Sequence, residues 1–565
     1  MRCRKGQRSG TLTELDRRYD ALLAEVTGPG GRLVIGEDEA GRAIVTNFPA
    51  TVPDLLRTFC ALYPDAEAVV AGDERLTFAQ VDRISEAVAH GLVARGIKKG
   101  DRVAIAMRNC PSWVVAYMGI VKAGAIATLL NGWWEAHEME HALTLTDPAL
   151  IIADPPRARR IATRCADRTV LTIPIEEPIE TALAELLGAS ADDAPLPVIG
   201  PEDDATILFT SGSTGDSKGA LSTHRAVTTG TYAYSTGLMV LLGILTEDGR
   251  APDAQARTLL TVPLFHVTGE VPVMLNSFVI GRCMVLMPKW DPAEALRLIE
   301  KERITYFVGV PTMSLEIMTH PDRDKYDLSS LKDITGGGAP RPISHVERLQ
   351  AAFPSARPAL GYGLTETNAA GCANYWDNYA GKPASTGRAQ SPLVQLAILG
   401  EGDRHLPAGE VGEIGIKSAA NIKGYWRNLS ATDAAFTADH YLRTGDVGYL
   451  DEDGYLFIVD RKKEIIIRGG ENIATAEVEA ACYACPDVAE VSVFGAPDDR
   501  LGEVPVAVVH LEPDATLDEA QLRRFLDGQL AKFKIPERFI FSAEPLPRLG
   551  TGKFDRRALK VQYSR

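Results

Sequence analysis

Apolar and polar positions alternate regularly along the chain from about residue 51 onward. Segments with apolar residues at helical spacing take turns with short, continuous apolar runs of the kind that form buried strands. The expected helices are 52–62, 77–95 and 112–123, and the expected strands are 66–70, 102–106 and 125–130. Helices that alternate with buried strands predict a largely parallel sheet, and therefore an α/β fold with a large domain of parallel or mixed sheets packed with helices.

A different pattern begins after residue 463. Helices 475–485 and 517–530 and strands 488–494, 504–510 and 538–541 follow one another within about a hundred residues, which is typical of a compact, mobile α+β domain. A charged break at 460–463 separates two apolar runs and suits an exposed interdomain link. We therefore divide the chain into an N-terminal extension (1–50), a large domain (51–459), a hinge (460–463) and a small C-terminal domain (464–565).

Composition and charge exclude several classes of function. The 565 residues are 45% hydrophobic and 24% charged, as in soluble globular proteins. A net charge of −15 and a pI near 5.3 argue against a general nucleic-acid binder. No run of about 18 apolar residues predicts a transmembrane helix. Eight scattered cysteines do not form a disulfide framework, so we expect a cytoplasmic protein, and a homodimer is compatible with the sequence.

The most informative stretch is the loop that follows the apolar run 207–209. Hydroxyl residues alternate there with glycines around one lysine: Thr210, Ser211, Gly212, Ser213, Thr214, Gly215, Ser217, Lys218 and Gly219. Hydroxyls, backbone amides and a lysine can hold a phosphate, and glycines let the backbone approach it. The loop is not a Walker A motif, because Ser217 precedes the lysine and Gly219 follows it. A flexible surface loop is the alternative.

Two short patterns invite a metal interpretation that we do not favour. His137, Glu138 and His141 match the His-Glu-x-x-His zinc motif, but no third ligand is evident. We favour a solvated helix face, with Met139, Ala142 and Leu143 turned inward. Cys482 and Cys485 form a Cys-x-x-Cys pair without a second pair. Packing of both cysteines against a core is the expected explanation.

Three later stretches carry residue types suited to a nucleotide. Gly336, Gly337 and Gly338 end an expected strand and would let a flat group lie against the backbone, although a structural turn is the alternative. Glu366 is a hard oxygen ligand suited to magnesium on phosphates, next to the hydroxyl of Thr365. Asp446 could accept hydrogen bonds from two ribose hydroxyls, or could cap a turn.

Together with the later motifs in their order, the loop resembles the signature of the adenylate-forming superfamily, which contains acyl-CoA synthetases, aryl-CoA ligases, firefly luciferase and peptide-synthetase adenylation domains. The resemblance covers about residues 55–560. It implies that the loop binds ATP phosphates, that Glu366 and Thr210 hold Mg²⁺, and that Lys553 and His266 act in catalysis with Thr210, Lys218 and Glu366. The implied nucleotide and coenzyme contacts further include Gly337, Gly338, Ala339, Gly361, Tyr362, Gly363, Thr365, Asp446, Arg461, Lys463, Gly469 and Gly470.

Within this family Lys463 corresponds to the hinge pivot, and Gly469 and Gly470 to the loop that lines the pantetheine tunnel. His266 corresponds to a residue beside the acyl carboxylate and the thiol entrance. Peptide-synthetase domains typically carry aspartate at that position, so histidine argues against an amino acid substrate. Glu270, close by, could meet a polar substrate group or face water.

The resemblance implies an acyl-CoA synthetase that uses ATP, Mg²⁺ and coenzyme A to activate a fatty, alicyclic or aryl carboxylic acid through an acyl-AMP. Gly309, the three-glycine run, Ala369 and Gly371 suggest a roomy acid pocket. One alternative is an acyl-AMP ligase that loads a carrier protein. A second is an inactive nucleotide-binding sensor, which would be expected to lack Lys553 or Glu366.

Overall fold

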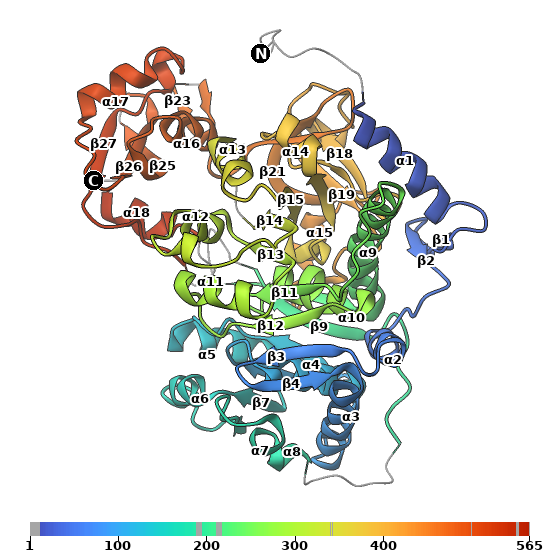
Figure 1. Ribbon diagram of the computed structural model, residues 1–565. Helices are drawn as coiled ribbons and strands as arrows, with labels where there is room; N and C mark the ends of the chain where they lie inside the picture. The colour runs from blue at the N-terminus through green and yellow to red at the C-terminus, as the bar shows by residue number, and fades with distance from the viewer. Residues whose placement is uncertain are drawn as a thin grey trace.

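The computed structural model describes residues 12–187, 195–210, 217–338, 341, 343–469, 471–498, 500–549 and 553–563. A large body formed by the N-terminal three quarters of the chain carries a small C-terminal domain on one side, at the upper left of Figure 1. The predicted architecture of a large α/β domain followed by a small α+β domain is therefore confirmed.

Two sheets form the centre of the large domain. The nine-stranded sheet has the order β17-β16-β15-β14-β13-β11-β12-β3-β4, and the seven-stranded sheet has the order β20-β10-β9-β6-β5-β7-β8. The pairings from β3 through β12, β11, β13 and β14 to β15 are parallel, and antiparallel strands lie at the edges. Parallel neighbours bring the carboxyl ends of β13, β14 and β15 to one edge, where ligands bind in open α/β sheets.

The strands have the following bounds. The nine-stranded sheet contains β3 (Glu67–Ala71), β4 (Glu74–Thr77), β11 (Arg257–Leu260), β12 (Cys283–Leu286), β13 (Tyr306–Gly309), β14 (Asp333–Gly337), β15 (Arg357–Gly363), β16 (Gly371–Tyr375) and β17 (Arg388–Ala389). The seven-stranded sheet contains β5 (Arg102–Ala106), β6 (Ile126–Leu129), β7 (Leu150–Ala153), β8 (Val170–Thr172), β9 (Asp204–Phe209), β10 (Gly219–Thr223) and β20 (Gly424–Tyr425). A four-stranded antiparallel sheet contains β18 (Gln395–Leu399), β19 (Gly412–Lys417), β21 (Leu442–Leu450) and β22 (Leu456–Arg461).

Helices cover the sheets of the large domain. They are α2 (Val52–Leu62), α3 (Phe78–Ala94), α4 (Pro111–Lys122), α5 (Ala136–Thr146), α6 (Pro155–Ala162), α7 (Ile179–Ala182), α8 (Ala184–Leu187), α9 (His224–Glu247), α10 (Asn276–Ile280), α11 (Pro292–Lys301), α12 (Pro311–Thr319), α13 (Ile343–Ala352), α14 (Trp376–Gly381) and α15 (Leu429–Ala435). A π-helix, Gly269–Leu275, precedes α10. The helix α4 is buried at every residue because it lies between the two sheets' layers, with Trp113 and Tyr117 in the main core.

Local signals explain why several helices start where they do. The hydroxyl of Thr51 caps α2 by accepting from Asp54 N, and a proline stands in the first turn. Thr77 and Gln80 form a capping box at the start of α3. The bounds of α2 and β5 agree with the prediction to the residue.

The small domain packs α16 (Thr475–Tyr483), α17 (Glu519–Leu526) and α18 (Arg556–Tyr563) against β23 (Ile466–Arg468), β24 (Glu471–Ile473), β25 (Val488–Asp498), β26 (Gly502–Leu511) and β27 (Arg538–Ser542). Cys482 and Cys485 are buried in its apolar core, as core packing predicts.

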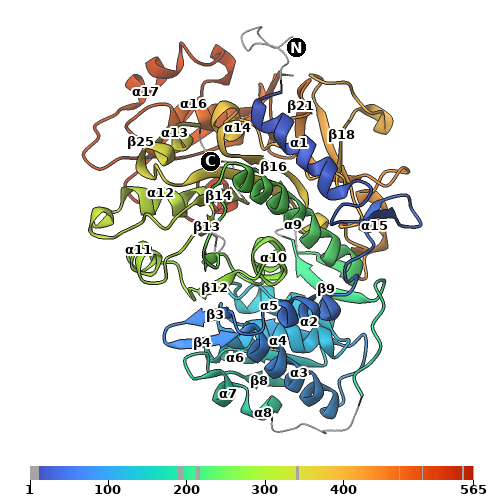
Figure 2. The ribbon, with the colours of Figure 1, turned by 45° about the vertical axis from the view of Figure 1, so that its right-hand side comes forward.

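The first described segment also folds against the large domain. It contains α1 (Glu14–Thr27) and a short hairpin of β1 (Ile35–Glu37) and β2 (Ala43–Val45). The helix α1 lies beside α9 in both views (Figures 1 and 2). In the part of the chain that the structure describes, no helix is both long and apolar enough to cross a bilayer.

The histidine motif lies on α5, whose inward side chains Met139, Ala142 and Leu143 are buried as predicted. His141 Nε2 lies 3.1 Å from the carbonyl oxygen of Ser217, at the end of the phosphate loop. Among the described residues, no group of three or more acidic, histidine or cysteine side chains is placed to hold a metal ion.

Candidate active site

The expected phosphate loop connects β9 to β10, which are antiparallel neighbours. Thr210 N donates to the carbonyl oxygen of Lys218 at 3.0 Å and closes the base of the loop. Ser211, Gly212, Ser213, Thr214 and Gly215 lie outside the described residues, so their predicted roles stay predictions. Lys218 Nζ lies 4.8 Å from the ring centre of Tyr425 on the neighbouring strand β20, where a cation–π contact holds it.

Glu366 is brought to the same place from a short 3₁₀ turn, Thr365–Thr367. Its Oε1 accepts a hydrogen bond from the hydroxyl of Tyr425 at 2.9 Å. Burial raises the pKa of Glu366, while Tyr425, Arg461 and Lys218 oppose that rise. One carboxylate beside a lysine and a hydroxyl loop fits Mg²⁺, because that ion usually takes one or two protein carboxylates and completes its shell with water and phosphate oxygens.

Asp446 forms the centre of a second cluster. Its Oδ2 accepts from the hydroxyl of Tyr362 at 2.6 Å, and its Oδ1 lies 3.2 Å from Arg461 Nε. Asp446 and Arg461 stand opposite each other on β21 and β22, which explains their contact. Burial raises the pKa of Asp446 and Arg461 lowers it. The structure thus brings together three residues that the family resemblance implies as nucleotide contacts.

The glycines of the expected adenine surface are not all alike. A Cβ on Gly337 would meet only the carbonyl oxygen of Gly361, at 3.8 Å, and Gly338 has a φ of +75°. These two positions keep space open in front of β14. Ala339 lies outside the described residues.

Other glycines in the expected acid pocket serve packing instead. A Cβ on Gly336 would lie 2.6 Å from the guanidinium of Arg341, and one on Gly371 would lie 2.2 Å from the carbonyl oxygen of Tyr362. A Cβ on Gly363, a position expected to contact the nucleotide, would lie 2.0 Å from the carbonyl oxygen of Ala369. At Gly336 and Gly371 the expectation of pocket space is therefore wrong, because side chain and backbone fill it.

Lys553 reaches from the small domain into this site. Its Cε lies 3.7 Å from the Cβ position of Gly338 on the large domain. Burial, helped by Arg461, lowers the pKa of Lys553 to about 8, although Asp446 and Glu464 oppose the shift. The lysine is therefore close enough to the strand ends to act on a group bound there.

His266 lies on the far side of the same space, after β11. Burial and the charge of Lys553 lower its pKa to about 3, so the imidazole is neutral at neutral pH. Its Nδ1 accepts from the backbone N–H of Thr268 at 3.3 Å, which favours the proton on Nε2. A neutral ring with an N–H donor suits a carboxyl oxygen.

Glu270 does not face water, and that expectation is wrong. The side chain is fully buried, and its Oε1 accepts from the hydroxyl of Tyr117 on α4 at 2.7 Å. Burial raises the pKa of Glu270 to about 7. The carboxyl group points toward the packing layer between the two sheets.

The residues of the predicted hinge span the end of β22 and the turn that leads to β23. Lys463 is exposed in the turn between β22 and β23. Gly469, with a φ of +58°, begins the tight turn between β23 and β24, and its N–H donates to Leu501 O at 2.7 Å. Gly470 lies outside the described residues.

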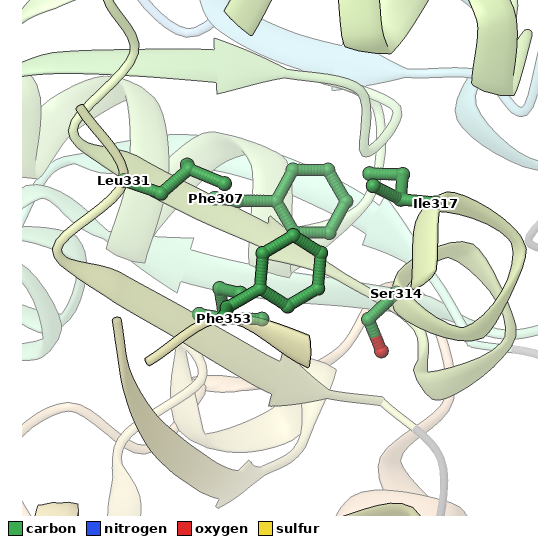
Figure 3. Close-up of a pocket in the computed structure, with 6 residues that line it drawn as sticks. Phe307, Ser314, Ile317, Leu331 and Phe353 are labelled. Carbon is green, nitrogen blue, oxygen red and sulfur yellow. The ribbon is translucent and has the colours of Figure 1, made fainter. Parts of the chain in front are cut away.

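Two hollows are present near the strand ends. The larger one, of about 50 Å³, adjoins Phe265, the neighbour of His266, and its lining includes Arg108, Trp133, Arg157, Lys289 and Trp290. The smaller one is lined by side chains of β13, α12 and β14 and by two residues just outside β14 and α13 (Figure 3): Phe307, Ser314, Ile317, Ile334, Leu331 and Phe353. Only the larger hollow combines positive charge, aromatic surface and proximity to the site.

Sequence reasoning missed two residues that help to build this site. Tyr425 holds both Glu366 and Lys218, and Tyr234 on α9 donates its hydroxyl to Ala369 O at 2.7 Å. Both tyrosines contact residues far away in the sequence, so no local sequence pattern predicts these contacts.

Comparison with known proteins agrees with this geometry. Residues 56–426 match the model of the AMP-binding enzyme family, and residues 477–553 match its C-terminal domain. The chain belongs to the AMP-binding enzyme family. This confirms the superfamily that the motifs indicate and the predicted enzyme class of AMP-forming acid–CoA ligases.

Relatives within the family extend over nearly the whole chain. A protein of Bacillus subtilis (strain 168) named long-chain-fatty-acid–CoA ligase is 33% identical over 90% of this chain and 94% of its own length. A feruloyl-CoA synthase of an Amycolatopsis species is 35% identical over 87% and 94%. The crystal structure of ATP-bound MatB from Rhodopseudomonas palustris aligns with a TM-score of 0.80 at 30% identity, over 91% of this chain and 99% of that one.

Proposed function

We propose that the protein joins a carboxylic acid to ATP as an acyl-AMP and then transfers the acyl group to coenzyme A, with release of AMP and pyrophosphate. The observation that carries this proposal is the contact between Lys553 of the small domain and Gly338 of the large domain. Lys553 Cε lies 3.7 Å from the Cβ position of Gly338, beside the Asp446–Arg461 pair and within electrostatic reach of His266. A binding protein would not need a buried lysine there.

The first step makes the carboxylate a better electrophile. A carboxylate oxygen attacks the α-phosphorus of ATP, the bond to the bridging oxygen breaks, and pyrophosphate leaves. Charge that accumulates on the phosphoryl oxygens requires preorganised cations and donors. Lys553 and Lys218 supply positive charge, and neutral His266 can donate to the acid without attracting a second anion. Mg²⁺ bound by Glu366 would neutralise further phosphate charge.

The second step needs a thiol, and the larger hollow supports coenzyme A as its source. Three cations, Arg108, Arg157 and Lys289, line that hollow together with the aromatic rings of Trp133 and Trp290. Phosphates and an adenine ring suit such a lining. Its position next to Phe265 would direct a thiol toward the carbon held by His266. An acyl-AMP ligase that serves a carrier protein would not need an aromatic and cationic nucleotide surface.

The acid is proposed by class. The relatives are named for long-chain fatty acids, for ferulate and for an alicyclic propanoate. The surroundings of the acid in this chain include Tyr234 and the open face of Gly337. We propose a fatty, aryl or alicyclic acid without an ammonium group, because no aspartate stands at position 266.

Mass spectrometry tests the proposal directly. The protein is incubated with ATP, Mg²⁺ and a panel of fatty, aryl and alicyclic acids, with and without coenzyme A. Formation of acyl-CoA from one acid class is the expected result. Adenylates that accumulate and ignore coenzyme A would favour the carrier-protein alternative, and the absence of any adenylate would contradict the proposal.

A further inference from the structure

One face of α9 runs outward from the proposed active site. Gly230, Tyr234 and Gly237 are spaced by four and three residues and therefore share that face. Gly230 packs against Asn368, two residues after Glu366, with its Cβ position 2.7 Å from the carbonyl oxygen of Asn368. Tyr234 OH lies 3.8 Å from the Cβ position of Gly361, whereas Gly237 lies one turn farther out.

A side chain from the N-terminal extension meets the outer end of this face. Tyr19, on α1, stacks on Tyr375 with ring centres 6.2 Å apart. The hydroxyls of Tyr375 and Tyr19 lie 3.0 and 3.3 Å from the Cβ position of Gly237. Because α9 rises 1.5 Å per residue, Tyr19 stands about one turn beyond Tyr234.

The helix that carries Tyr19 is firmly attached. Leu15, Leu22 and Leu23 of α1 pack against the buried end of α9 and Trp376. Asp16 accepts from Asn378 Nδ2 at 3.0 Å and from Tyr455 OH at 2.8 Å. The position of Tyr19 is therefore fixed by contacts on both sides of it.

The end of the extension, at residues 48 and 49, packs against the N-terminal half of α9. Tyr232 OH donates to Pro49 O at 2.7 Å, and Phe48 packs against the ring of Tyr232 with centres 5.7 Å apart. The segment thus follows α9 along its length, as the blue and green helices show in Figure 2. It precedes residue 56, where the match to the family model begins.

We propose that Tyr19, from this N-terminal segment, closes the outer end of the acid-binding site and limits the length of the acid that the enzyme accepts. The inference rests on the proposed function. An acid whose carboxyl group lies near His266 and whose chain follows α9 past Tyr234 meets the rings of Tyr19 and Tyr375. Tyr19 would then act as a specificity-determining residue.

The test compares acids of increasing chain length by acid-dependent exchange of pyrophosphate into ATP. Tyr19→Ala opens space beyond Gly237, so kcat/KM for an acid two methylenes longer than the best wild-type substrate should rise about sixteenfold relative to that substrate, at roughly fourfold per buried CH₂. Tyr19→Phe should keep the wild-type profile. Tyr19→Leu retains an apolar side chain in the interface and should shift the profile in the same direction as Tyr19→Ala.

Leu15→Ala is the matched control, because it removes packing from the same helix without reaching Gly237. An unchanged length profile in both Tyr19→Ala and Tyr19→Leu, or the same shift in Leu15→Ala, would overturn the inference. Exchange with at least one acid in the wild type shows that the acyl-AMP step of the proposed function, on which this inference rests, holds in either case. A wild type that supports exchange with no acid would overturn the proposed function itself.

Discussion

At the scale of single residues, Lys553 connects structure and chemistry most directly. Its burial against Gly338 lowers its pKa to about 8, so the lysine is protonated at neutral pH but loses its proton in mildly alkaline solution. The protonated form is the one that can meet phosphoryl charge.

Lys553→Gln should therefore reduce acyl-AMP formation at least a hundredfold, as the loss of a preorganised charge does elsewhere. Conversion of presynthesised acyl-AMP to thioester should continue. In the wild type, kcat/KM for adenylation should fall as pH rises through about 8, because kcat/KM reports the free enzyme, and Lys553→Gln should lack this limb. Lys560→Gln, at an exposed lysine on α18, is the control. Equal loss of both half-reactions would contradict the assignment.

Glu270 should affect stability rather than chemistry. Burial raises its pKa from 4.5 to about 7, so between these values the folded protein binds more protons than the unfolded chain. Stability due to this group is present below pH 4.5 and is lost as pH rises, by up to about 3 kcal/mol. Glu270→Gln should remove that loss, so the variant should lose less stability than the wild type between pH 5 and 8 in urea denaturation. If the free energy of unfolding changed with pH in the same way in the wild type and in Glu270→Gln, the role of Glu270 would be disproved.

Residue types and family motifs alone indicate much of the site. Glu366 and Asp446 are residue types suited to magnesium and ribose, whereas only the family resemblance implies a role for Lys553. The fold brings Asp446 and Lys553 to one place with Arg461. The sequence could not predict why residue 336 is a glycine, because only the folded chain brings the Arg341 guanidinium to the place that a Cβ would occupy.

At the scale of elements, the link between the domains is more than a loop. Asp460 is the second-last residue of β22 and begins the predicted hinge, and its carboxylate accepts from the backbone N–H of Thr475 and, at 3.0 Å, from the Thr475 hydroxyl. Thr475 opens α16 in the small domain, where N–H groups are unpaired and attract negative charge. An aspartate of the predicted hinge thus caps a helix of the small domain.

Asp460→Ala should slow acyl-AMP formation about tenfold, since the cap is worth about 1 to 2 kcal/mol and orients the domain that carries Lys553. Asp460→Asn should restore most of the rate, because its amide oxygen still accepts. Pyrophosphate exchange measures the effect. Full activity of Asp460→Ala, or no rescue by asparagine, would contradict this role.

Element positions follow well from periodicity and turn residues. The predicted bounds of the helix 52–62 and the strand 102–106 are correct because caps and apolar runs end there. The strand expected over 125–130 is shorter, as β6 covers Ile126–Leu129. The π-helix at Gly269–Leu275 could not be predicted, since its geometry depends on packing between α9 and α10.

At the scale of the whole molecule, contacts between distant segments hold the extension in place. Asp16 is 3% exposed and joins α1 to Asn378, Tyr455 and Arg388. This anchoring could not be predicted, because a charged helical pattern does not reveal its partners. The domain division, with a hinge at 460–463, stays a prediction.

Asp16→Ala should lower the free energy of unfolding of the large domain by about 3 kcal/mol, because it leaves several buried partners unpaired. Asp20→Ala is the control. Asp20 also pairs with Arg388, at 3.0 Å, but its side chain is 40% exposed, so its loss should cost less than about 1 kcal/mol. Urea denaturation monitored by tryptophan fluorescence distinguishes the two. Equal losses would show that Asp16 is not an anchor.

The central claim is that the acid's own oxygen attacks the α-phosphorus of ATP. A carboxylic acid labelled with ¹⁸O in both carboxyl oxygens is incubated with the protein, ATP, Mg²⁺ and coenzyme A, and the AMP is analysed by mass spectrometry. The account predicts AMP that carries one ¹⁸O, because the bridging oxygen of the acyl-AMP leaves with the phosphate. Unlabelled AMP, or ADP in its place, would contradict it.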